Sequence, residues 1–249
     1  MSKEILEQIN QLRRKHEDDY INTIHTFIDI ERNIKIYMHQ HHGCELQNTL
    51  DLRFQFITFE NIQQRSQAAG QILQPQILID NGGDHTSPIV LAGADGSMIF
   101  KRGRTICTAA AFFGDASPLN AAVVVPMCGN TTIAETYAIK TTLSQAKAEA
   151  VRRICIVIDN AAALQFTASV VQAESANSQA VSEYIDRYPQ LSTVAKQIKE
   201  EVTGMNFLAV VWQKSHTRER SIFSQANNGA DRLCREYADS VAARLLTQQ

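Results

Sequence analysis

Short apolar runs in the second two-thirds of the chain predict strands. They lie at residues 89–94, 105–113, 121–126, 154–158 and 207–212. The second and third runs are expected to form antiparallel strands. The run at 154–158 is a continuous β-branched stretch, which is typical of a buried parallel strand.

Helical periodicity fills the gaps between these runs. It covers residues 133–151, 160–172, 176–203 and about 229–246. The third range is broken near Pro189, and Thr131 or Thr132 is the expected N-cap of the first helix. The order of elements is strand, strand, strand, helix, strand, helices, strand, helix. This order predicts an α/β fold with a mixed five-stranded sheet flanked by helices.

The first third of the chain follows a different pattern. Apolar residues recur at three- and four-residue steps between residues 5 and 38, which predicts one long helix or two shorter ones. Residues 50–56 and 76–79 favour short strands, and residues 61–73 favour a helix weakly. A dense cluster of turn-forming residues at 80–88 then marks a boundary.

This boundary divides the chain into two predicted regions. Residues 1–85 form a mainly helical N-terminal extension with short strands, and residues 86–249 form the α/β domain. The extension has a net charge of −4 and no Trp, whereas the remainder has a net charge of +2. An acidic helical segment is better suited to self-association or to docking a protein partner than to binding nucleic acid.

Composition narrows the class of protein. The chain is 44% hydrophobic and 20% charged, as ordinary soluble globular proteins are. No apolar run approaches the roughly 18 residues that span a membrane, and the first residues suit neither a secretory signal nor a transit peptide. The five cysteines are scattered without a CxxC pair, which argues against disulfides and structural zinc. We expect an intracellular protein, nuclear or cytoplasmic, with no membrane partner.

Four acidic residues stand where this topology could gather them. Asp95 ends the first strand, Glu135 lies in the first turns of the first helix, Asp159 ends the strand at 154–158, and Asp231 starts the last helix. Taken singly, an Asp before Gly is usually a turn residue, and a Glu near a helix start usually interacts with the helix dipole. Their joint placement matters more, because carboxyl ends of neighbouring parallel strands meet at one edge of a sheet.

A cluster of these carboxylates requires cations. Like charges in one pocket repel one another and raise pKa values unless a cation shares the site. Oxygen ligands alone suit Mg²⁺ or Mn²⁺ and not zinc. Two such ions about 3.5–4 Å apart form the arrangement that hydrolyses phosphodiesters. The pattern therefore predicts a divalent-metal centre.

The motifs around these acids resemble those of the ribonuclease H family. They are ADGS at 94–97, TTIAET at 131–136, IVIDN at 156–160, and KSHT with NNGADRL across 214–233. They occur in the family's order and cover about residues 89–246, nearly a whole ribonuclease H domain. The insertion between SHT and NNGAD is most similar to that of retrotransposon-encoded ribonucleases H.

The resemblance implies a ribonuclease-H-like fold and a metal-dependent endonuclease that cuts the RNA strand of an RNA–DNA hybrid. It implies that Asp95, Glu135, Asp159 and Asp231 hold two Mg²⁺ ions, for which Mn²⁺ can substitute. It also implies a catalytic role for His216 in proton transfer or product release, which suits a group that titrates near neutrality.

The same resemblance places substrate contacts around the acids. The candidates are Ser97, Lys101, Arg102, Asn130, Thr131, Thr132 and Asn160. Family members usually have Asn just before the helix Glu and Gln shortly after the strand-end Asp, where this chain has Thr131, Thr132 and Ala161. Because the side chain of Ala161 cannot hydrogen-bond, we expect selectivity for the hybrid to be weaker or to depend on other contacts. Lys101 and Arg102 suit a phosphate contact and a solvated turn about equally well.

Two other functions stay open at this level. A catalytically weak or inactive ribonuclease-H-fold subunit could scaffold a nucleoprotein complex, and the changed substrate positions favour that reading. The four acids argue against it, because a lost site has no need for like-charge crowding. An exonuclease or a DNA-cutting enzyme could also use the same carboxylates, since a fold does not set the substrate.

Overall fold

One mixed sheet with helices on both faces organises the protein. The computed structural model describes residues 54–67, 73–82, 85–101, 103–115, 117–126, 129–173, 179–215 and 221–247. Its elements are β1 (Gln55–Ile57), α2 (Phe59–Gln67), β2 (Gln76–Asp80), β3 (Ile89–Lys101), β4 (Arg104–Phe112), β5 (Ala121–Val124), α3 (Thr131–Ala148), β6 (Arg153–Ile158), α4 (Ala161–Gln172), α5 (Gln179–Arg187), α6 (Leu191–Val202), β7 (Phe207–Trp212) and α7 (Ile222–Thr247). None of the helices in these ranges has both the length and the hydropathy to cross a membrane.

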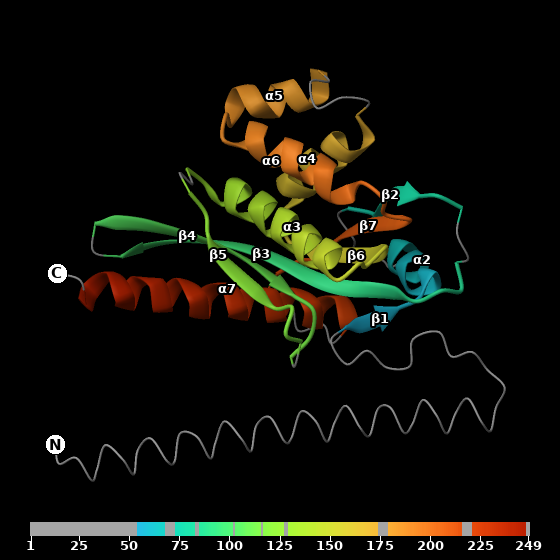
Figure 1. The fold of residues 1–249 in the computed structure, drawn as a ribbon, viewed down its shortest axis with the longest axis horizontal. Helices are drawn as coiled ribbons and strands as arrows, with labels where there is room; N and C mark the ends of the chain where they lie inside the picture. Colours follow the sequence, from blue (N-terminus) through green and yellow to red (C-terminus); the bar gives the residue numbers. More distant parts are fainter. Residues whose placement is uncertain are drawn as a thin grey trace, which may run out of the picture. The chain divides into compact units, whose positions relative to one another are not determined.

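The sheet has seven strands, in the order β2-β7-β6-β3-β4-β5, with β1 paired to β3 off this path (Figure 1). Strands β3, β6 and β7 run parallel at its centre, and the other pairs are antiparallel. The five strands predicted from apolar runs are all present in the predicted order, which confirms the mixed sheet flanked by helices. Strand β3 extends to Lys101, past its predicted end, because residues 95–101 pair with β4.

The compact unit that contains this sheet begins at Leu52, not near residue 86. Two strands from the predicted extension belong to it: Gln55 pairs with Leu91, and Asp80 pairs with Phe207. The predicted boundary therefore falls inside the unit, because a turn-rich stretch resembles a linker although it only connects β2 to β3. Residues 1–51 form a separate unit, and they lie outside the described residues together with the helix predicted there.

Each face of the sheet has its own apolar layer. Helices α3, α4 and α6 pack on one face over side chains that include Ala92 and Ile156. Helices α2 and α7 pack on the other face, where Ile62 and Phe223 join Leu91 in a second cluster. Figure 1 shows α3 and α7 on opposite sides of the sheet. Successive side chains along each strand therefore point to opposite faces of the sheet and pack against different helices.

Helix α7 begins at Ile222, about two turns before its predicted start. Residues 227 and 228, which lie before the predicted start near 229, are therefore inside the helix. Ser221 Oγ accepts a hydrogen bond from the Ser224 backbone N–H at 3.1 Å, as an N-cap does. Gly229 suggested a helix boundary, but it serves packing: a Cβ at this position would lie 2.3 Å from the Phe112 ring.

Candidate metal centre

Strand register brings Asp95 level with Asp159. Strands β3 and β6 are parallel, and their last paired residues are Gly93 and Val157. Asp95 and Asp159 each follow two residues later on their own strand. Because β6 ends at Ile158 while β3 continues, the two carboxylates lie where the sheet opens.

Glu135 reaches the same place from the first turns of α3. Its Oε2 accepts a hydrogen bond from the Gly96 backbone N–H at 3.0 Å, and its side chain is buried. The helix begins earlier than a threonine cap would allow. Asn130 is the N-cap, and its Oδ1 accepts from the Ile133 backbone N–H at 3.0 Å. The expectation of a Thr131 or Thr132 cap is therefore wrong, because Asn130 already has the extended backbone that a cap requires.

Two glycines let helices from both faces approach β3 closely. A Cβ on Gly96 would lie 2.2 Å from the Glu135 backbone nitrogen, and one on Gly93 would lie 2.1 Å from the Ala226 carbonyl oxygen. Real Cβ atoms do not make such contacts, so any side chain here would push a helix away. The glycine after Asp95 thus places α3, and Glu135 with it, against the strand.

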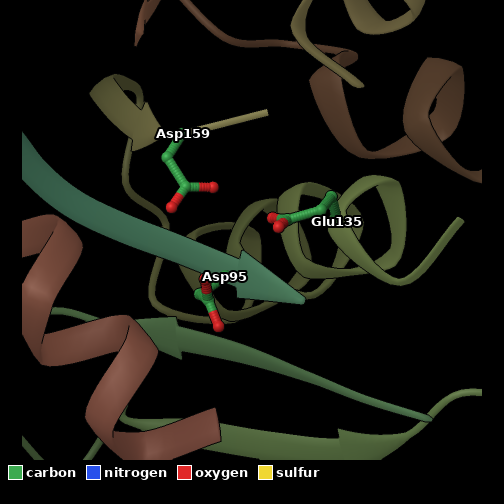
Figure 2. Close-up of side chains that lie close together, drawn as sticks. All are labelled: Asp95, Glu135 and Asp159. Atoms are coloured by element: carbon green, nitrogen blue, oxygen red, sulfur yellow. The ribbon is translucent and has the colours of Figure 1, made fainter. Parts of the chain in front are cut away.

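Three of the four predicted acids converge. Asp95, Glu135 and Asp159 each offer a carboxylate oxygen within 4.8 Å of those of the other two. Figure 2 shows the three side chains around one space, contributed by β3, α3 and the turn after β6. Asp95 is only 6% exposed and Glu135 only 5%.

The surroundings of these carboxyl groups favour their neutral, protonated forms. Burial, followed by the nearby carboxylates of Asp159 and Asp231, raises the pKa of Asp95 to about 7. Burial and then the charges of Asp95 and Asp159 raise the pKa of Glu135 well above its ordinary range. A divalent cation would relieve this repulsion, and carboxylate oxygens are the ligands that Mg²⁺ and Mn²⁺ prefer. The residues present therefore fit such an ion.

Asp231 lies beside this group but is held by another residue. Arg235, one turn further along α7, donates from Nε to Asp231 Oδ1 at 2.6 Å and from Nη2 to Oδ2. Asp231 is close enough to raise the pKa of Asp95, yet it is not among the three residues whose ligand atoms converge. The structure thus places Asp231 at the edge of the site, paired with the permanently charged guanidinium of Arg235.

The predicted substrate contacts differ in their exposure and in their hydrogen bonds. Asn160 caps α4, with its Oδ1 accepting from the Ala163 backbone N–H at 3.0 Å. Ser97 is half-buried on β3, whereas Thr131 is exposed and Thr132 half-buried at the start of α3.

Two predicted site residues lie outside the described part of the chain, and one is ion-paired. His216 and Arg102 are the two that are not described. Lys101 forms an exposed ion pair with Asp239 of α7, with an N–O distance of 2.5 Å.

Sequence reasoning missed two residues that contact the acids. The Cys234 thiol hydrogen-bonds to Asp95, and its sulfur lies 3.2 Å from Thr108 Oγ1. Its position three residues after Asp231 on one helix face was the available signal. Trp212 is buried, and its indole Nε1 donates to the Asp159 carbonyl at 2.8 Å.

Comparisons with known proteins give matches in structure alone. No protein-family model matches the chain, and no curated protein sequence does. The ribonuclease H type 1 of the archaeon Halobacterium salinarum is 18% identical over 60% of this chain and 97% of that chain, with a TM-score of 0.40. The N-terminal ribonuclease H domain of a Mycobacterium tuberculosis protein is 12% identical over 62% of this chain and 98% of that chain, with a TM-score of 0.42. The ribonuclease H domain of PFV is 14% identical over 60% and 94%, with a TM-score of 0.42. All three are ribonuclease H domains, the family whose motifs the sequence resembles.

Proposed function

We propose that the chain is a divalent-metal-dependent endonuclease that hydrolyses the RNA strand of RNA–DNA hybrids. The observation that supports this most directly is the convergence of Asp95, Glu135 and Asp159 at the opening of the sheet. These three residues would hold a Mg²⁺ or Mn²⁺ ion. When bound, such an ion supplies activation of the attacking water and stabilisation of the leaving oxygen.

Asp231 and His216 complete the proposal. Asp231 is the proposed ligand for a second ion, which requires it to exchange its bond with Arg235 for a metal contact. His216 follows the segment after β7 and is proposed to transfer a proton or assist product release.

Substrate recognition in this proposal relies on hydroxyl groups and on positive charge. The Oδ1 atoms of Asn130 and Asn160 accept the cap bonds of α3 and α4. Asn130 and Asn160 remain proposed substrate contacts through their Nδ2 groups. Ser97, Thr131 and Thr132 are the hydroxyl groups proposed to read the 2′-hydroxyls of the RNA strand. Lys101 and Arg102 are the proposed phosphate contacts. Residues 1–85 remain the proposed site of self-association or partner docking.

The test is cleavage of a labelled hybrid by the full chain in Mg²⁺ or Mn²⁺. Asp159→Asn keeps the shape of the ligand but removes its charge, and we expect a rate loss of more than about 100-fold, since even outer-shell partners of a metal cost 10–100-fold. Asp186→Asn, on the exposed surface of α5, is the control with the same chemical change and should cleave like wild type. Equal cleavage by wild type and Asp159→Asn would remove the proposed mechanism. Duplex DNA and duplex RNA as substrates distinguish the hybrid-cutting enzyme from other nucleases.

A scaffold subunit is the second candidate, and the pairing of Asp231 with Arg235 favours it. In a scaffold subunit, this guanidinium would neutralise one of the four acids in place of a metal ion. A metal titration separates the two functions. A working site should gain thermal stability with Mn²⁺ by mass action, and a lost site should not.

A further inference from the structure

A buried arginine from outside the predicted catalytic domain contacts the segment next to Asp159. Arg65 lies in the last turn of α2 and is 8% exposed. Its Nη2 donates to Oε1 of Gln213, a residue 148 positions away in the chain, and its guanidinium lies 5.7 Å from the centre of the Phe223 ring. Burying a guanidinium is costly unless it is hydrogen-bonded, so this contact holds α2 in one position against the end of β7.

Gln213 in turn lies level with Asp159. The last paired residues of β6 and β7 are Ile158 and Trp212, so Asp159 and Gln213 each come next. The Gln213 backbone N–H donates to the Ile158 carbonyl at 2.8 Å, and Trp212 Nε1 donates to the Asp159 carbonyl at 2.8 Å. The backbone on both sides of the Ile158–Asp159 peptide bond is therefore held from β7.

The Gln213 side chain also directs the chain that follows. It is 1% exposed, and its Nε2 donates to the Lys214 carbonyl at 3.2 Å while Oε1 accepts from Arg65. Side-chain direction alternates along a strand, so Gln213 points to the face opposite Trp212, which is the face that α2 covers. The same amide thus links α2 to the segment that leads to His216.

We propose that Arg65 is a positioning residue for the metal centre, acting through Gln213 on Asp159 and on the segment after β7. This inference rests on the proposed function. A metal ligand must be held within a fraction of an ångström of its working position, and its supporting contacts determine whether it is. Loss of the Arg65–Gln213 contact lets the ends of β6 and β7 shift without changing any ligand.

The experiment measures Mn²⁺ affinity of the full chain by calorimetry, together with kcat and KM on a hybrid. Arg65→Met keeps most of the side-chain length but removes the donors, and we expect about tenfold weaker Mn²⁺ binding with a loss in kcat. Gln213→Met breaks the same contact from the other side and should give a similar loss. Adding Arg65→Met to Gln213→Met should cost no further Mn²⁺ affinity, because the contact through which Arg65 acts is already gone. Arg65→Lys retains a donor and should recover part of the affinity.

Ile62→Ala is the matched control. Ile62 is 1% exposed on the same helix and in the same apolar cluster, and its side chain carries no polar atom. It should lower Tm at least as much as Arg65→Met while leaving Mn²⁺ affinity unchanged well below Tm. If Arg65→Met fails to fold, Gln213→Met carries the same expectation.

The outcomes separate this inference from the proposed function. Wild type that binds Mn²⁺ and cleaves hybrid, with Arg65→Met and Gln213→Met unchanged or altered no more than Ile62→Ala, overturns the positioning role alone. Wild type that binds no Mn²⁺ overturns the proposed function and the positioning role together. Additive losses in the double variant overturn the claim that Arg65 acts through Gln213.

Discussion

At the scale of the residue, Asp95 and Glu135 couple the stability of the fold to pH. Both carboxyl groups are buried beside other carboxylates, so their charged forms are disfavoured in the folded protein. The pKa of Asp95 is about 7 in the folded protein against 3.8 for an unperturbed group. A raised folded-state pKa favours folding below the unfolded value, and this contribution is lost as the pH rises through the folded value.

The first prediction follows from that sign. In EDTA, wild type should lose on the order of 3 kcal/mol of unfolding free energy from this group between about pH 4 and pH 7. Asp95→Asn has no titrating group there and should show a flatter profile. Urea unfolding at a series of pH values measures both, with Asp186→Asn as the control that should follow wild type. Parallel profiles for wild type and Asp95→Asn would contradict the raised pKa.

The second prediction concerns the pair that holds Asp231. Arg235→Gln removes the competing cation and leaves the carboxylate available, so Mn²⁺ should bind more tightly. The pair is partly exposed, and such pairs contribute little, so the expected gain is about two- to fivefold. Calorimetry on the full chain measures this, and Arg244→Gln, further along the same helix, is the control. A Mn²⁺ affinity equal to or lower than that of wild type would show that Arg235 does not compete with metal.

At the scale of the element, the centre depends on how closely α3 approaches β3. The helix backbone at Ala134 and Glu135 lies where a Cβ of residue 96 would stand, so the approach is possible only with glycine. This contact sets the position of Glu135 and gives the Gly96 N–H its acceptor. The packing of two elements thus determines one ligand.

The third prediction tests that packing. Gly96→Ala should destabilise the fold by about 1–3 kcal/mol, as overpacking does, and should weaken Mn²⁺ binding by displacing Glu135. Gly129→Ala is the matched control, because a Cβ there meets nothing within 4 Å. Urea unfolding and a Mn²⁺ titration measure the two effects. If Gly96→Ala binds Mn²⁺ like wild type, the close approach of α3 to β3 does not position Glu135 for metal binding.

At the scale of the whole molecule, the sheet is larger than the five strands that the sequence predicts, because seven strands form it. Strand β1 pairs with β3, β2 pairs with β7, and α2 buries Ile62 in the layer under α7. Residues 52–85 are therefore part of the same folded unit as the carboxylate cluster. Through Arg65 it also contacts the segment beside Asp159.

The fourth prediction follows for truncated chains. A chain that starts at residue 52 should stay folded, because the compact unit begins there. A chain that starts at residue 86 loses the buried Ile57 and Ile62, which alone removes roughly 3–6 kcal/mol, and it exposes the edge of β7. Circular dichroism and thermal unfolding compare the two. Equal Tm for both truncated chains would show that β1, α2 and β2 are dispensable.

The sequence by itself determined the elements and the identity of the acids. The run at 154–158, the break at Pro189 and the helix around Glu135 all follow from local periodicity, and the structure has them where the pattern predicts. Local spacing also predicted that Asp159 ends a buried parallel strand. Asp95, predicted to end the first strand, lies inside β3, and strand register brings it level with Asp159. Periodicity and turn chemistry are properties of neighbouring residues, so one chain is enough to read them.

Only the tertiary structure decided which segments pair into the sheet and which acidic side chains lie close together. The pairing of β2 with β7, the contact of Arg65 with Gln213 and the hold of Arg235 on Asp231 depend on side chains and strand edges brought together by the fold. A local pattern predicts that a strand or a charge exists, but not which partner is nearest. For the same reason the sequence pattern places Gly229 at the start of the last helix, whereas the Phe112 ring packed against it explains a glycine inside the helix.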